Sequence, residues 1–233
     1  MDRRYPRQYF MAEDLKRIVV MNSKGGCGKT TIATNLASCY ARHGFHTALF
    51  DYDPQGSSMR WLRSRDDSAP GIYGVVAHRS STNNTKTRSW QLRLPIGTQR
   101  VIIDTPAGIR ETELLGHVQN IDEIIIPVLP SPIDIHSTAD FIRDLLLIGK
   151  LRASNTRVNI ITNRVKANTI SFQALMRFLN TLKIPVIAQI KDTQNYVHAA
   201  EKGLGIHELN KKQLEDDKRL WDKVLKQLET RDS

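Results

Sequence analysis

Short runs of β-branched and aliphatic residues alternate along the chain with longer segments in which apolar residues recur every three or four positions. The first pattern is typical of strands covered on both faces of a sheet, and the second of helices that cover such a sheet. Strands are predicted over Arg17–Asn22, Thr47–Asp51, Val101–Asp104, Glu123–Val128, Val158–Asn163 and Pro185–Ile190, with a further short strand proposed over Ile72–Val76. Helices are predicted over Lys29–His43, Ile133–Leu151, Ser171–Leu182 and Asn210–Leu228. The alternation predicts an α/β, doubly wound fold with a mainly parallel sheet flanked by helices.

The domain organisation predicted from the sequence is simple. Residues 64–99 are the least regular part of the chain, and Ser80–Thr85 is a loop by composition. No internal repeat is present, and no linker separates two domains. We therefore expect residues 1–16 to form a short N-terminal extension and residues 17–233 to form one domain, which includes a C-terminal helix at 210–228.

The composition excludes several classes of protein. Hydrophobic residues make up 40% of the chain and charged residues 25%, which excludes disordered and collagen-like chains. The longest apolar runs are far shorter than the roughly 20 residues that a membrane-spanning helix needs. The N-terminus lacks the apolar stretch of a signal peptide, and two cysteines are too few for a disulfide framework. We therefore expect a cytoplasmic protein.

The net charge is +10, and the excess of basic residues lies in two segments. Residues 60–100 hold eight basic and two acidic residues, and residues 151–190 hold six basic and no acidic residues. Such segments are typical of contact with nucleic acid, but a solvated basic surface explains the charge equally well. Charge alone leaves both interpretations open.

A glycine-rich loop carries the strongest chemical signal. The segment Ser23–Thr31, with the sequence SKGGCGKTT, directly follows a predicted strand and directly precedes a predicted helix, which is the context of a phosphate-binding loop. Its glycines let the backbone N–H groups approach phosphate oxygens, aided by the positive end of the following helix. Lys29 is placed to neutralise the β- and γ-phosphates, and the hydroxyl of Thr30 to ligate Mg²⁺. No dinucleotide G-x-G-x-x-G pattern is present.

One departure from the ordinary phosphate loop narrows the class. The ordinary motif has a glycine where this chain has Ser23, and it requires no lysine at position 24. With Lys24 the loop resembles the deviant Walker A motif K-G-G-x-G-K-S/T of the ParA/MinD family of P-loop ATPases, above all of the small ParA-type partition and positioning ATPases. The resemblance implies that Lys24 reaches across an ATP-sandwich homodimer to the phosphates of the partner subunit.

Three further motifs at strand ends continue this resemblance. The segment around Asp51 and Asp53 is similar to the family's D-x-D-P-Q motif, which implies that Asp53 orients the attacking water and that Asp51 supports the Mg²⁺ shell. Asp104 stands where the family has its Walker B aspartate, which holds Mg²⁺ through water. Asn163 occupies the place of an adenine-recognising asparagine. From the residues alone, the two aspartates could equally form a turn, and Asn163 could cap one.

The predicted site uses ATP and Mg²⁺ and has three sets of residues. The catalytic residues are Lys24, Lys29 and Asp53. The nucleotide-binding residues are Gly25, Gly26, Cys27, Gly28, Lys29, Thr30, Thr31 and Asn163. The metal-binding residues are Thr30, Asp51 and Asp104. No other metal site is predicted, because the seven histidines show no ligand spacing.

The resemblance implies a slow ATPase that dimerises on ATP, binds nucleoid DNA without sequence preference and positions or segregates a cargo. A cargo adaptor protein would stimulate hydrolysis. The candidate DNA contacts are Lys191, Lys202, Lys211 and Lys212, with Arg152, Arg157, Arg177 and Lys183 as an alternative set and Arg60, Arg63 and Arg65 as a third. These contacts would be with phosphates and therefore sensitive to salt.

Two other functions are weighed against this one. A MinD-like ATPase on the membrane, regulating division or organelle placement, would end in an amphipathic helix with a basic polar face. Residues 210–233 instead hold seven basic and six acidic residues, which favours a helix docked on the core. An enzyme acting on a small substrate would need a second pocket, for which no constellation of residues is found. Because only about 16 residues precede the first strand, we also expect no N-terminal domain that reads specific DNA.

Overall fold

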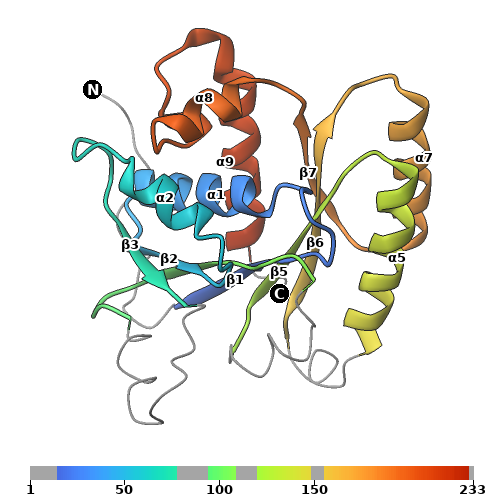
Figure 1. Cartoon of the computed structure of the whole chain (residues 1–233), viewed down its shortest axis with the longest axis horizontal. Helices are drawn as coiled ribbons and strands as arrows, with labels where there is room; N and C mark the ends of the chain where they lie inside the picture. Colours follow the sequence, from blue (N-terminus) through green and yellow to red (C-terminus); the bar gives the residue numbers. More distant parts are fainter. Residues whose placement is uncertain (1–14, 78–93, 109–119, 148–154, 231–233) are drawn as a thin grey trace.

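A parallel seven-stranded sheet forms the centre of the protein (Figure 1). The computed structural model describes residues 15–77, 94–108, 120–147 and 155–230. The strands are β1 (Lys16–Val20), β2 (Thr47–Asp51), β3 (Ile72–Val76), β4 (Arg100–Asp104), β5 (Glu123–Val128), β6 (Arg157–Val165) and β7 (Val186–Lys191). Their order across the sheet is β3-β2-β4-β1-β5-β6-β7. This is the doubly wound α/β fold that the sequence predicts.

The helices in the described ranges are α1 (Lys29–Arg42), α2 (Ser57–Arg63), α5 (Pro132–Leu147), α7 (Ile170–Thr181), α8 (Asn195–Glu201) and α9 (Glu215–Glu229). Two short 3₁₀ turns, η2 (Ile206–Glu208) and η3 (Lys212–Leu214), lie between α8 and α9. Successive side chains of a strand point to opposite faces of its sheet. Accordingly, Ile18 and Val20 pack with α1, α2, α8 and α9, whereas Val19 and Met21 pack with α5 and α7.

The predicted strands agree with the observed ones to within two residues at each end. Two helices of seven residues, α2 and α8, were not predicted. The predicted helix 210–228 is wrong at its start, because Leu209 and Lys211 have extended backbones and α9 begins only at Glu215. The predicted end of the helix from Ile133, at residues 148–151, lies outside the described residues.

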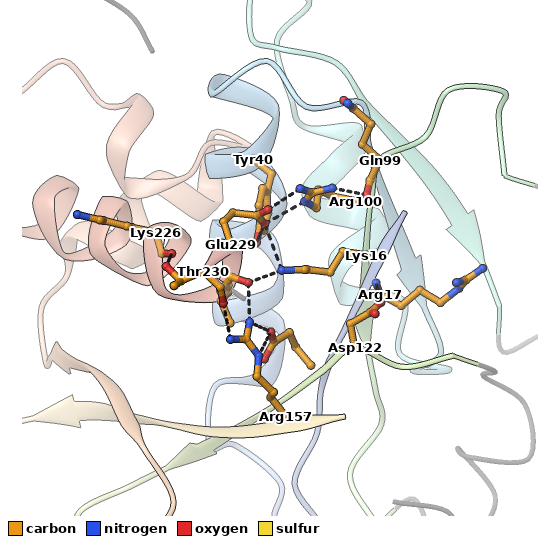
Figure 2. A network of polar contacts seen from close by, with 12 residues as sticks. Lys16, Arg17, Tyr40, Gln99, Arg100, Asp122, Arg157, Lys226, Glu229 and Thr230 are labelled. Atoms are coloured by element: carbon orange, nitrogen blue, oxygen red, sulfur yellow. Dashed lines mark hydrogen bonds and ion pairs between the residues drawn. The ribbon is translucent and has the colours of Figure 1, made fainter. Parts of the chain in front are cut away.

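Three basic side chains at the amino ends of β1, β4 and β6 hold the last turn of α9 (Figure 2). Lys16 and Arg157 donate to the carbonyl oxygen of Leu228, Arg157 over 2.8 Å. Arg100 makes a two-pronged ion pair with Glu229, at 2.5 and 3.0 Å. The last carbonyls of a helix lack intrahelical donors and carry a partial negative charge, so cations there stabilise the helix end.

The apolar stripe of α9 is buried as well. Trp221, Val224, Leu225 and Leu228 are all at most 5% exposed and belong to the core on the α1 side of the sheet. The expectation that this helix docks on the core is therefore confirmed. Among the described residues, no helix has the length and apolar character needed to cross a bilayer.

A buried histidine makes the stability of this core depend on pH. His207 in η2 is 4% exposed, and neither ring nitrogen has a hydrogen-bond partner among the described residues. Burial lowers the pKa of His207 to about 4, against the smaller raising effect of Glu208. The unfolded chain, with an ordinary histidine pKa of 6.5, therefore binds more protons than the folded chain between pH 6.5 and 4.

We predict that the unfolding free energy falls as the pH drops from 6.5 to 4, by up to about 3 kcal/mol from His207 alone, since one pKa unit corresponds to about 1.4 kcal/mol. Urea unfolding of the unmodified chain and of His207→Leu at several pH values measures this term. The variant should lose less stability over this range. Parallel pH curves for the two proteins would assign the loss to other groups.

Candidate nucleotide-binding site

The phosphate loop leaves the sheet after β1 and enters α1, and one of its glycines is required by geometry. Gly28 is the residue before α1 and has a φ of 98°, in the left-handed region. A Cβ at Gly28 would also lie 2.0 Å from Nδ2 of Asn163. Any other residue would therefore be strained in backbone and would displace the Asn163 side chain. The loop packs against the carboxyl end of β6 at this point.

The ammonium group of Lys29 lies inside the loop. The residue is 7% exposed, and Nζ donates to the carbonyl oxygens of Lys24, at 2.7 Å, and of Asn22, at 3.1 Å. Gly25 and Gly26, by contrast, are exposed at the loop's outer rim. The loop thus has a buried positive charge beneath exposed backbone, the arrangement that binds the phosphates of a nucleotide.

Asp51 and Asp53, at the end of β2, differ in environment. Asp51 is fully buried, and its two oxygens accept from the backbone N–H groups of Asp53, at 3.0 Å, and Met59, at 3.1 Å. Asp53 is half-buried and accepts from the N–H of Gln55 at 2.9 Å. Asp51 therefore fixes both the backbone of Asp53 and the start of α2. Its predicted support of a Mg²⁺ shell stays a prediction.

Asp104 is the buried carboxylate at the end of β4. It lies directly opposite Asp51 in the pairing of β4 with β2, and it is 0% exposed. Neither of its oxygens has a hydrogen-bond partner within the described part of the chain. Burial, and then the charge of Asp51, raise the pKa of Asp104 to about 7, although the nearby hydroxyls of Thr30 and Ser58 partly lower it.

These groups fit a magnesium ion. Mg²⁺ binds hard oxygen ligands, commonly one or two carboxylates together with phosphate oxygens and water. The buried carboxylate of Asp104, which has no hydrogen-bond partner among the described residues, and the nearby hydroxyl of Thr30 at the start of α1 offer such ligands. Ser58, which no sequence motif indicated, adds a fully buried hydroxyl that has no hydrogen-bond partner among the described residues.

The turn after β4 is bonded to the phosphate loop. The N–H of Gly108 donates to the carbonyl of Ser23 at 2.9 Å, and the hydroxyl of Thr105 donates to the carbonyl of Val20 at 2.9 Å. Gly108 has a φ of 69°. These two bonds connect the turn to the phosphate loop and to the end of β1.

Asn163 at the end of β6 is 4% exposed and binds the phosphate loop. Its Nδ2 donates to the carbonyl of Cys27 at 2.9 Å, and its Oδ1 accepts from the N–H of Arg164 at 2.9 Å. An amide has two N–H groups and two acceptor lone pairs, so one of each is left for a ligand. A cavity of about 270 Å³ lined by Arg164, Leu129 and Lys166 lies beside this strand end. Adenine recognition by Asn163 stays a prediction.

The candidate DNA contacts are distributed over several surfaces. The first set lies exposed at the end of β7, after α8 and at the start of η3; it comprises Lys191, Lys202, Lys211 and Lys212. In the alternative set, Arg177 on α7 and Lys183 after it are exposed, but Arg157 pairs with Glu123 and the end of α9. Arg152 lies outside the described residues.

The third set is divided between surface and core. Arg60 and Arg63 on α2 are exposed. The side chain of Arg65 is 5% exposed and forms an ion pair with Glu208, at 2.5 Å, besides donating to the carbonyl of Gly203 at 2.9 Å. We leave Arg65 and Arg157 out of any proposed interface, because both are committed to contacts within the protein.

A group of potential metal ligands gathers between α1 and α9, and it comprises Cys39, His43 and Asp222. Nδ1 of His43 already bonds the carbonyl of Cys39 at 2.8 Å, and Nε2 lies 3.4 Å from Asp222. Burial raises the pKa of the Cys39 thiol strongly, which disfavours the thiolate that a metal needs. We interpret the group as a polar contact at the end of α1.

Comparisons with known proteins agree with this geometry. The CobQ/CobB/MinD/ParA nucleotide binding domain matches residues 18–206. The chain is similar to two proteins named maintenance of carboxysome distribution protein A. The protein from Halothiobacillus neapolitanus is 28% identical over 82% of this chain and 87% of its own length. The protein from Gloeobacter kilaueensis is 31% identical over 81% and 82%. An ATP complex of Cyanothece McdA has the same fold, with a TM-score of 0.70, 18% identity and coverage of 94% and 98%.

Proposed function

The chain belongs to the CobQ/CobB/MinD/ParA nucleotide-binding family as a ParA-type positioning ATPase, and we propose that it distributes a cargo over the nucleoid. It does so by an ATP-dependent cycle of dimerisation and DNA binding. The observation that carries the proposal is the loop with two lysines, in which Lys29 is buried beneath the phosphate-binding backbone and Lys24 stands at its start. The names of the two relatives suggest a large protein assembly as cargo.

The proposed reaction is attack of water on the γ-phosphate. Lys29 neutralises charge on the phosphates from its own subunit, and Lys24 does so in the partner's site. Asp53, held by Asp51, orients the water. When bound by Asp104 and Thr30, Mg²⁺ neutralises phosphate charge. The turn at Gly108 is bonded to the loop and would report the presence of the γ-phosphate.

For DNA contact we favour the exposed lysines at the end of β7, after α8 and at the start of η3. All four are solvent-exposed; Lys202, Lys211 and Lys212 lie in the segment from the end of α8 to η3, and Lys191 lies at the end of β7, a strand that contacts α9. In Figure 1, α8 and the chain that follows it lie beyond α1, away from α5 and α7. Such a surface would bind phosphates without reading bases, which suits a nucleoid-associated protein in the cytoplasm.

We predict that the chain binds random-sequence duplex DNA with ATP but not with ADP. Affinity should fall steeply between about 50 and 200 mM salt, because each phosphate contact releases counterions. A Lys211→Glu, Lys212→Glu double variant should lose at least about tenfold in affinity, since two attractive contacts become repulsive. Fluorescence anisotropy at two salt concentrations measures both effects.

The matched control is the Arg177→Glu, Lys183→Glu variant, which makes the same charge change on the α7 side of the sheet. It should bind DNA as the unmodified chain does. If the control loses affinity and the first variant does not, the interface lies on the α7 side. If the chain does not bind DNA with any nucleotide, the proposal that it positions its cargo on the nucleoid is rejected.

A MinD-like role on the membrane is the second candidate. Septum site-determining proteins are among the relatives, with 24% identity for the protein from Thermotoga maritima. However, the apolar stripe of α9 is buried in the core and its last turn is held by Lys16, Arg100 and Arg157. Sedimentation with anionic liposomes and ATP would reveal membrane binding. The cargo adaptor that stimulates hydrolysis is proposed from family resemblance.

A further inference from the structure

Asn22, the last residue before the phosphate loop, is fully enclosed at 1% exposure and uses both ends of its amide. Its Oδ1 accepts a hydrogen bond from the backbone N–H of Lys24 at 3.1 Å. Its Nδ2 donates to the carbonyl oxygen of Pro127, at the end of β5, at 2.7 Å. The same Nδ2 lies 3.4 Å from the hydroxyl of Thr138 in α5. The side chain thus connects the loop to a neighbouring strand and helix.

The backbone of Lys24 is held by hydrogen bonds at both its N–H and its carbonyl group. Asn22 accepts from its N–H, and Nζ of Lys29 donates to its carbonyl at 2.7 Å. The thiol of Cys27 also donates to that carbonyl, at 3.3 Å. Because the backbone dihedrals of Lys24 set the direction in which its side chain leaves the loop, these bonds fix where that side chain begins.

An asparagine suits this position because it offers a donor and an acceptor together. An aspartate would keep the acceptor for Lys24 but could not donate to Pro127, and a leucine of similar size would do neither. The two shortest hydrogen bonds of the Asn22 amide are to main-chain groups, a buried one to Pro127 and a part-buried one to Lys24, and a main-chain group that loses such a bond costs free energy. The amide therefore ties the position of Lys24 to the sheet.

We propose that Asn22 is a positioning residue for Lys24: its amide holds the Lys24 backbone against β5 and α5 and so fixes the point from which the Lys24 side chain would reach a second subunit. This inference rests on the proposed ATP dimer. It adds that the position of the trans lysine depends on the hydrogen bond of Asn22 to Pro127, at the carboxyl end of β5 and 105 residues away in the sequence.

The test compares Asn22→Leu, Asn22→Asp and the unmodified full-length chain. Dimer formation with the non-hydrolysable analogue AMPPNP is measured by analytical ultracentrifugation, and ADP affinity of the monomer with a fluorescent ADP. We expect Asn22→Leu to weaken the AMPPNP dimer at least about tenfold, while ADP affinity changes by less than about threefold. Asn22→Asp, which keeps the acceptor for Lys24, should fall between Asn22→Leu and the unmodified chain.

Thr138→Val is the matched control, because it removes only the longest contact of the amide and leaves those to Lys24 and Pro127. Its dimer should equal that of the unmodified chain. Equal losses of ADP affinity and of dimer in Asn22→Leu would indicate general damage to the loop and would overturn the inference.

Hydrogen exchange at the Lys24 amide in the nucleotide-free chain gives a readout that needs no dimer. Asn22→Leu should speed this exchange, and Thr138→Val should not. Unchanged exchange in Asn22→Leu would refute the positioning role whatever the dimer does. If instead exchange increases but the unmodified chain forms no AMPPNP dimer, the proposed dimerisation fails while Asn22 is still shown to hold Lys24.

Discussion

Asp104→Asn is expected to make the nucleotide-free protein more stable while it removes Mg²⁺-dependent ATP hydrolysis. The carboxylate is buried without a hydrogen-bond partner in the described structure, and burial raises its pKa to about 7. An ionised carboxylate in such a place costs free energy that a neutral amide avoids. Hydrolysis should fall at least about 100-fold, because the variant loses the charge that would hold the metal.

The size of this gain in stability depends on pH. The pKa of Asp104 is raised from 3.8 to about 7, so the folded chain binds more protons than the unfolded chain between these values. The unmodified protein therefore loses stability from this group as the pH rises from 3.8 through 7. The full shift corresponds to about 4 kcal/mol, and a buried amide retains part of that cost, so we expect a gain of about 1–3 kcal/mol at pH 8. Urea unfolding without Mg²⁺ or nucleotide measures it.

Asp51→Asn is the matched control, because Asp51 is equally buried and lies opposite Asp104 on the neighbouring strand. Both oxygens of Asp51 accept backbone N–H bonds, and an amide can accept only one of them. The control variant should therefore be less stable than the unmodified chain at pH 8. A loss of stability in Asp104→Asn as well would show that its carboxylate is satisfied in the metal-free protein.

The fold could be predicted because the strands of a doubly covered sheet are apolar almost throughout. The predicted strands over Thr47–Asp51 and Glu123–Val128 match β2 and β5 at both ends. Periodicity needs several turns to be visible, so the seven-residue helices α2 and α8 were missed. The break before α9 was missed for a different reason: Leu214 continues the apolar stripe of the helix although it lies in a separate 3₁₀ turn.

The site was predictable where its residues are consecutive in the chain. The phosphate-binding residues from Lys24 to Thr31 follow one another in the chain, so their chemistry can be read from the sequence. The hydrogen bonds of Asn22 and Asn163, by contrast, join residues more than 100 positions apart. No local sequence pattern predicts such contacts. Counting charges likewise could not separate the exposed Lys211 from the enclosed Arg65, since the difference depends on whether a partner such as Glu208 lies beside the side chain.

Lys24→Ala is expected to bind nucleotide but to form no stable ATP dimer. In the described structure the buried cation of the loop is Lys29, and Lys24 contributes its carbonyl to that cation, which alanine also provides. ADP affinity should therefore stay within about threefold of the unmodified value, whereas the AMPPNP dimer should weaken at least about 100-fold, because a charge-assisted contact with the partner's phosphates is lost. The control Lys29→Ala should lose ADP binding itself. Analytical ultracentrifugation and fluorescent ADP separate the two.

Mixing two inactive variants distinguishes action in trans from action in cis. In a two-fold dimer of Lys24→Ala with Asp53→Ala, the site on the Lys24→Ala subunit keeps its own Asp53 and receives Lys24 from the other subunit. If Lys24 acts in trans, random pairing should restore up to about a quarter of the unmodified ATPase rate, since half of the dimers would each contain one complete site. If Lys24 acts in cis, each site lacks one group and mixing restores nothing. A mixture as inactive as its components, together with a stable AMPPNP dimer of Lys24→Ala, would reject the trans role and with it the coupling of ATP to dimerisation.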